Sequence, residues 1–300
     1  MGRTSPLFSQ CASGANWDKK LKTPDLQIWQ KIISFTTIPK RGFSLPFALL
    51  KNEFDGSNKR KLIRVDTYEG AMAWHPDNEH ILYLGTEADP NNPEEKLKGV
   101  YSVSIRSRER KLIYQDPEFR GHMALSPDGK HLVLVSKDSK EKRELYIVGF
   151  DGKNRRQLVK SDNSIWCPVF TPDSKEIIYT LEVKRDGKTI RNSVMAVPFE
   201  GGKPREIYAS ENPQDYFGTY SSSWLRDGRF VFNIRSNPGG TFHCALSLDG
   251  KSEPVKLSYK KGAYFSISPD GTRAVFQNGK YGTKLWLMSD FLPKDELAEK

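Results

Sequence analysis

The sequence repeats one tight turn at near-regular intervals, and this periodicity constrains the fold more than any other feature. Its most regular copy is "LSPDG", Leu125–Gly129. A type I turn favours Ser at the first position, Pro at the second and Gly at the fourth. Related turns begin at Trp74, Phe170, Trp224 and Ile267, so successive copies lie 51, 45, 54 and 43 residues apart. Repeats of this length are typical of β-propellers, in which each repeat forms one blade.

The residues around each turn predict four antiparallel strands per repeat. An apolar run such as "HLVLVSKD" follows the turn, and a third run such as "ELYIVGF" comes after a polar loop. A Gly-bearing turn then leads to a short fourth run such as "RQLVK". Strands joined by hairpins in this order form a meander, the unit of a blade. Before each turn a large residue follows a small one, as in Ala124-Leu125, which suits an innermost strand packed between blades.

A weaker copy precedes the five clear ones. The segment Phe47–Val65 reads as a third strand, a DG turn and a fourth strand, and Thr23-Pro24-Asp25 stands where the turn belongs. The alternative is an N-terminal extension with a stray proline. We predict an all-β fold, a six-bladed β-propeller of four-stranded antiparallel blades, as a single domain over residues 1–300. Its repeats start near residues 23, 74, 125, 170, 224 and 267.

The last repeat lacks a recognisable fourth strand. After "KLWLMSD" the chain continues as "FLPKDELAEK", and residues 291–300 read as a tail. Open sheet edges promote aggregation, so a propeller needs its ring closed. We expect residues 1–15, around Pro6–Ser13, to supply the closing outer strand.

Composition limits the classes of partner. The net charge is +10, with Lys and Arg scattered over many hairpin loops. A nucleic-acid site would gather basic residues on one face together with stacking aromatics, so we expect no specific nucleic acid partner. No apolar run approaches the roughly 18 residues of a membrane helix, and no apolar region near the N-terminus indicates a signal peptide. We expect a monomer.

Motifs for catalysis, metals and cofactors are lacking. The sequence has no G-x-S-x-G, H-E-x-x-H, C-x-x-C or G-x-G-x-x-G pattern. The three cysteines Cys11, Cys167 and Cys244 are too widely spaced for a metal motif, and we expect Cys167 and Cys244 to be small buried residues. We therefore expect no cofactor and no metal. An enzyme stays open, because propeller enzymes assemble their sites from several blades.

The repeat pattern, best seen in Leu125–Val159, resembles the propeller repeat of TolB-like proteins. Recognisable repeats cover about residues 71–290. Such repeats occur in TolB, a periplasmic partner of envelope proteins, in propeller domains of prolyl-oligopeptidase-like peptidases and in some polysaccharide lyases. The resemblance implies a bare propeller, with neither the N-terminal domain of TolB nor a hydrolase domain. It also implies a periplasmic or secreted location.

Two functions compete. The first is a non-catalytic binding propeller that recognises a protein, a peptide or a small polar ligand at one end of the ring. The alternative is a small propeller enzyme, a hydrolase or lyase acting on carbohydrate, with its site at the channel mouth. A convergent cluster of His, Asp, Glu and Arg, especially one able to hold a metal, would favour the enzyme.

We expect the ligand site on the loops between blades, which vary in sequence whereas the turns repeat. Aromatic residues beside charged ones on such loops are typical of binding surfaces. For any single ring, the alternative is that it only caps the interface between two blades. The candidate residues are Tyr68, Glu69, Phe119, Arg120, His122, Trp166, Tyr216, Tyr220 and Tyr264, with Asp215 beside them.

Overall fold

The computed structural model describes residues 31–37, 47–53, 60–65, 67–77, 79–89, 91–137, 142–210, 212–236, 239–257, 264–267, 273–278 and 284–289. Within these ranges the regular structure consists of β-strands, and no residue is helical. No described helix is therefore long and apolar enough to cross a membrane. The all-β fold class is confirmed.

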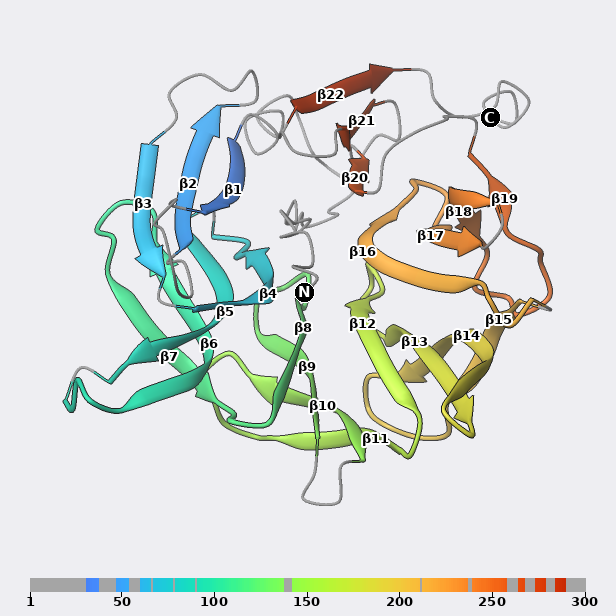
Figure 1. Ribbon diagram of the computed structural model, residues 1–300, viewed down its shortest axis with the longest axis horizontal. Helices are drawn as coiled ribbons and strands as arrows, with labels where there is room; N and C mark the ends of the chain where they lie inside the picture. Colours follow the sequence, from blue (N-terminus) through green and yellow to red (C-terminus); the bar gives the residue numbers. More distant parts are fainter. Residues whose placement is uncertain are drawn as a thin grey trace, which may run out of the picture.

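The described strands form six antiparallel sheets, one for each sequence repeat, in which neighbours along the chain are hydrogen-bonded (Figure 1). The first sheet contains β1 (Lys31–Thr37), β2 (Phe47–Glu53) and β3 (Arg60–Val65); the second contains β4 (Thr67–Trp74), β5 (His80–Ala88), β6 (Lys96–Ser104) and β7 (Arg110–Gln115). The third contains β8 (Phe119–Leu125), β9 (His131–Lys137), β10 (Arg143–Gly149) and β11 (Arg156–Ser161); the fourth contains β12 (Ser164–Phe170), β13 (Glu176–Arg185), β14 (Lys188–Pro198) and β15 (Arg205–Ala209). The fifth contains β16 (Tyr216–Trp224), β17 (Phe230–Ser236), β18 (Gly240–Leu246) and β19 (Val255–Lys256); the sixth contains β20 (Tyr264–Ile267), β21 (Arg273–Asn278) and β22 (Lys284–Ser289).

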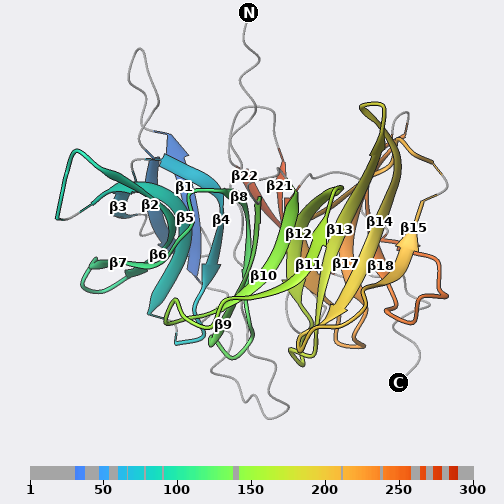
Figure 2. The ribbon, with the colours of Figure 1, turned by 90° about the horizontal axis from the view of Figure 1, so that it is seen from below.

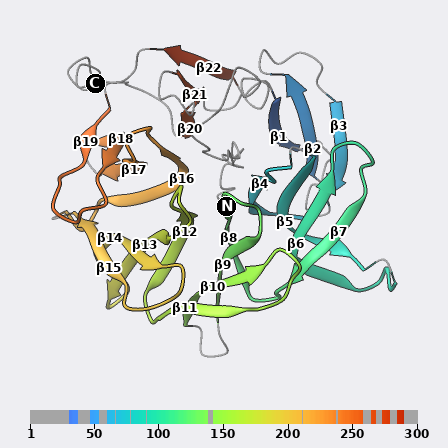
Figure 3. The ribbon, with the colours of Figure 1, turned by 180° about the vertical axis from the view of Figure 1, so that it is seen from behind.

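The sheets surround a common axis. Seen down that axis, β4, β8, β12, β16 and β20 lie nearest the middle, and the later strands of each sheet lie progressively further out (Figures 1 and 3). Contacts join β4 to β8, β8 to β12, β12 to β16 and β16 to β20. From the side, the strands run across the thickness of the ring, and the long β13–β14 hairpin projects from one end (Figure 2). This arrangement is a β-propeller of meander sheets.

The meander order predicted for the repeats is confirmed in the second to fifth sheets, which each show four strands. In the first sheet, Phe47–Glu53 and Arg60–Val65 are strands, as predicted for the weak repeat. The turn predicted at Thr23-Pro24-Asp25, the closing strand at residues 1–15 and the tail at 291–300 lie outside the described residues. A ring of six closed blades therefore stays a prediction.

The core consists of the interfaces between adjacent sheets. Side chains alternate across each strand with period two, so every middle strand serves two interfaces. In β5, Ile81 and Tyr83 pack toward the first sheet, whereas Leu82 and Leu84 pack toward the third. All four side chains are fully buried. Burying a large apolar side chain contributes roughly 1.5–3 kcal/mol, so the stack of sheets is held chiefly by these interfaces.

The repeated turns have the geometry that their residues predict. In the third sheet, the Ser126 hydroxyl donates to Asp128 at 2.6 Å and accepts from the His131 N–H at 2.9 Å. The Gly129 N–H donates to the Ser126 carbonyl at 2.9 Å. Gly129 has φ of 76°, a conformation that glycine adopts at little cost. These bonds join β8 to β9 and stay within the turn.

Candidate functional site

The candidate residues gather at one end of the ring, which we call the loop end. Here each first strand begins and each second strand meets the third: Phe119 pairs with Ser136, and Lys137 pairs with Arg143. The opposite end, the turn end, carries the repeated turns. Tyr68 and Glu69 lie in β4; Phe119, Arg120 and His122 lie in β8; Trp166 lies in β12; Tyr216 and Tyr220 lie in β16; and Tyr264 lies in β20.

Their placement on loops was wrong, because these segments are the starts of the innermost strands. Each first strand of the second to fifth sheets has a shift in register shortly after it begins. In β12 the shift falls between Trp166 and Val169, and Cys167 there has φ of 50°. A β-bulge of this kind bends the strand and redirects side chains, and bulges are common beside binding and active sites. Pro168 fits this position, since proline within a sheet is confined to edges and bulges.

Two of the candidates meet across the interface of the third and fourth sheets. The His122 ring packs edge-on against the Trp166 ring, with centroids 5.3 Å apart. His122 Nδ1 lies 3.5 Å from the sulfur of Cys167. Trp166 Nε1 donates to Glu182 Oε2 at 3.4 Å, which orients the indole from its other side. Trp166 remains only partly buried, whereas His122 and Cys167 are buried.

The electrostatics of this site keep His122 neutral. Burial, and secondarily the charge on Arg143, lower the pKa of His122 to about 4. A Cys–His pair acts as a nucleophile when it forms a thiolate and an imidazolium. At neutral pH His122 is uncharged, so the imidazolium of such a pair is absent, and the contact between His122 and Cys167 suits packing better than nucleophilic catalysis.

A cationic cluster adjoins the Trp166 ring. The guanidinium of Arg143 lies over that ring, 5.1 Å from its centroid. Arg120 donates to Glu118 Oε2 at 2.9 Å and to the Phe119 carbonyl at 3.2 Å. Nevertheless, Arg120 Nε and Arg143 Nη1 are buried atoms without a hydrogen-bond partner. Since buried donors are nearly always paired, two such atoms in one cluster call for an explanation.

A third cation belongs to this cluster. Loss of solvent, followed by the charges on Arg120 and Arg143, lowers the pKa of Lys137 from its usual value, and Glu118 opposes this effect. The three cations therefore lie close enough to repel one another. Arg143 and Lys137 were not among the residues expected from the sequence. They are brought together because the end of β9 and the start of β10 pair directly, Lys137 with Arg143.

The remaining candidates have different surroundings. Phe119 is 2% exposed and packs in the core between the second and third sheets, so its ring caps an interface. Asp215 is buried and accepts hydrogen bonds from Ser210 and Ser236, which gives it a structural role. Tyr216 is partly buried. The side chains of Tyr68, Glu69, Tyr220 and Tyr264 lie outside the described residues.

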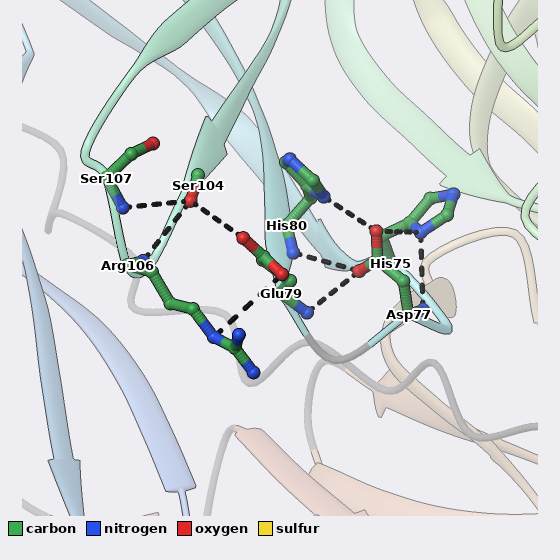
Figure 4. Close-up of polar contacts among 7 residues, drawn as sticks. All are labelled: His75, Asp77, Glu79, His80, Ser104, Arg106 and Ser107. Carbon is green, nitrogen blue, oxygen red and sulfur yellow. Dashed lines mark hydrogen bonds and ion pairs between the residues drawn. The ribbon is translucent and has the colours of Figure 1, made fainter.

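The turn end offers a polar network of a different kind (Figure 4). Asp77 Oδ2 lies 2.6 Å from His80 Nδ1 and 3.0 Å from His75 Nδ1. Burial alone would raise the pKa of Asp77, but hydrogen bonds from Glu79 and His80 hold it well below its usual range. The Ser104 hydroxyl lies 3.3 Å from Glu79 Oε1 and supports the neighbouring turn. Among the described residues, the polar contacts of this network lie within these two turns, so the network stabilises their geometry.

Two further expectations concern cysteines and metals. Cys167 and Cys244 are buried, as expected, whereas Cys11 lies outside the described residues. Within the described part of the chain, no group of three or more His, Cys, Asp or Glu side chains is placed to hold a metal ion.

Comparison with known proteins agrees with this architecture. The family model described as "TolB beta propeller domain" matches residues 28–290. Dipeptidyl-peptidase 5 of Porphyromonas gingivalis is 37% identical over 62 residues, which is 19% of this chain and 9% of the peptidase. The chain thus corresponds to a small part of that relative.

Solved structures resemble the chain in fold. TolB from Acinetobacter baumannii has a TM-score of 0.60 at 16% identity, and the match covers 81% of this chain and 57% of that one. Oligogalacturonate lyase from Vibrio parahaemolyticus has a TM-score of 0.58 at 12% identity, covering 95% and 77%. At such identities the likeness shows the fold alone, and the fold does not fix the function.

Proposed function

The chain belongs to the TolB beta propeller domain family, and we propose that it is a non-catalytic binding module that recognises an extended peptide or a small polar ligand at the loop end. The observation that carries this proposal is the partly exposed Trp166 ring, covered by the Arg143 guanidinium. Trp and Arg are the residues most enriched among those that dominate binding energies. They lie here on rigid strands, which favours a preformed site.

The state of His122 supports binding over catalysis. Its Nδ1 lies 3.5 Å from the sulfur of Cys167, and its lowered pKa leaves it uncharged at neutral pH. Both groups are buried, and the His122 ring packs edge-on against the Trp166 ring. If Trp166 contacts the ligand, removing its indole should abolish recognition.

The proposal is tested with an array of defined decapeptides. The full chain is expected to bind a subset of them, and Trp166→Ala should lose these peptides while its melting temperature falls by only a few degrees. The matched control is Val255→Ala, which shortens a 40%-exposed apolar side chain on the outermost strand β19 and should bind like the wild type.

Two outcomes would contradict the proposal. Peptide binding that survives in Trp166→Ala would place the site elsewhere. Turnover of an oligosaccharide by the wild-type chain, lost in Trp166→Ala but retained in Val255→Ala, would show that the same end of the ring is an active site. The second outcome is read from reducing-end or unsaturated products released from oligogalacturonate.

A further inference from the structure

Arg143 differs from the other arginines that reach a neighbouring strand. Arg110, Arg155, Arg191 and Arg205 each meet a carboxylate at 2.6–2.8 Å. Within the described residues Arg143 meets none: it lies over the Trp166 ring, and its Nη1 has no hydrogen-bond partner. Stacking on an aromatic face holds a guanidinium in place and leaves its N–H groups directed outward along its plane.

Arg120 presents a second unpaired donor in the same cluster. Its Nη1 and Nη2 are engaged by the Phe119 carbonyl and by Glu118, but its buried Nε has no acceptor. The side chain as a whole is 25% exposed, so part of Arg120 borders solvent although its Nε is buried. Strand β9 links the two arginines: the Lys137 N–H donates to the Glu118 carbonyl at 3.3 Å, just before Arg120, and Lys137 pairs with Arg143. In agreement with this geometry, burial and then the charge of Arg120 lower the pKa of Arg143.

Arg156 also has an unpaired buried donor, and its other contacts are those of an arginine with a structural role. Arg156 Nη1 has no partner, yet its Nη2 donates to the Phe199 carbonyl at 2.6 Å and its guanidinium lies over the Phe199 ring. That pair of contacts joins the third sheet to the fourth. Arg143 makes the stacking contact but no such hydrogen bond among the described residues, so the hydrogen-bonding capacity of its buried Nη1 remains unsatisfied.

Resting on the binding role proposed above, we propose that Arg120 and Arg143 together bind a carboxylate group of the ligand at the loop end. A carboxylate supplies two acceptors in the planar geometry that a guanidinium matches. It would satisfy the unpaired Nε of Arg120 and the unpaired Nη1 of Arg143, and it would offset the repulsion between these two cations. Its source is either a peptide C-terminus or an acidic side chain, both present in extended peptides.

The test uses glutarate and its uncharged analogue glutaramide as probes. The full chain is labelled with 5-fluorotryptophan, and the ¹⁹F resonance of Trp166 is assigned by its absence in Trp166→Phe. At constant ionic strength, glutarate is expected to shift this resonance saturably, whereas glutaramide should not. Arg143→Gln and Arg120→Gln should each weaken glutarate binding roughly tenfold or more, as expected for hydrogen bonds to a charged group.

The matched control is Arg106→Gln, which removes one positive charge from an 82%-exposed side chain at the turn end (Figure 4). It should leave glutarate binding unchanged. The source of the carboxylate is separated by comparing acetyl-Gly-Gly, which has a free C-terminus, with acetyl-Glu-amide. Tighter binding of either compound supports the proposal and identifies the carboxylate as a C-terminus or as an acidic side chain.

The proposal is overturned if glutaramide shifts the Trp166 resonance as glutarate does, if Arg143→Gln binds glutarate like the wild type, or if inorganic phosphate binds more tightly than glutarate. Failure here is distinct from failure of the binding role. If array peptides bind in a Trp166-dependent way but glutarate does not bind, only the proposed carboxylate site is refuted. Glutarate binding without any peptide binding would refute peptide recognition alone.

Discussion

Acidification from pH 7.5 to 5.0 should destabilise the folded chain through His122. Burial, with a smaller contribution from Arg143, lowers the pKa of His122 to about 4, whereas an unfolded histidine titrates near 6.5. Between these two pKa values, His122 therefore binds a proton in the unfolded state but not in the folded state. Stability due to neutral His122 is fully present above pH 6.5 and is lost as the pH falls toward 4. At pH 5.0 the loss amounts to about 2 kcal/mol of unfolding free energy.

The assay is urea denaturation at both pH values for the wild type and for His122→Gln. The variant should lose about 2 kcal/mol less than the wild type on acidification. His243, whose pKa is lowered to about 3 by burial, contributes equally to both proteins and cancels. If both proteins show the same pH dependence, His122 is not buried and neutral. An imidazolium beside Cys167 would then be possible at neutral pH, and the argument for a non-catalytic site would fail.

Two further predictions concern the interfaces and the thiol. Trp224→Phe removes the indole N–H that donates to the Phe170 carbonyl at 3.1 Å between the fourth and fifth sheets; urea denaturation should show a loss of about 1–3 kcal/mol, and an unchanged midpoint would contradict this bond's importance. Cys167 is 6% exposed beside a neutral histidine, so iodoacetamide at pH 7.5 should modify it at least about tenfold more slowly than free cysteine. Peptide mass spectrometry gives the rate at this position, and modification as fast as free cysteine would indicate a reactive thiolate.

The repeated turns made most of the fold predictable. The residue types of each turn predict its geometry, and the alternation of apolar and polar residues on either side predicts the strands. The Ser126–Gly129 turn is an example, since its residues make in the structure the bonds that the sequence predicts. The weak first repeat was also identified, because the alternation of Phe47–Val65 survives although its turn is degraded. Strand periodicity is local, so one copy of the pattern suffices to recognise it.

The site was only partly predictable. His122 and Trp166 were chosen for their chemistry, and the structure brings them into contact. Arg143 was missed, because it stands in the basic stretch "KEKR" and has no local feature that distinguishes it from other loop cations. Its place over Trp166 depends on β-strand pairing in one sheet and packing against the next, which sequence spacing does not reveal. The segments expected as loops belong to strands because pairing starts before each bulge and resumes after it: Phe119 pairs with Ser136, and Met123 pairs with Leu134.

Hydrogen exchange with and without a peptide selected on the array tests most directly whether the loop end is the binding site. The amides at the starts of β8, β10 and β12, around Arg120, Arg143 and Trp166, should become protected when the peptide binds. The turns at the other end, around Asp77 and Asp128, should exchange at unchanged rates. Protection confined to those turns, or spread evenly over the outer strands, would contradict a binding site at the loop end.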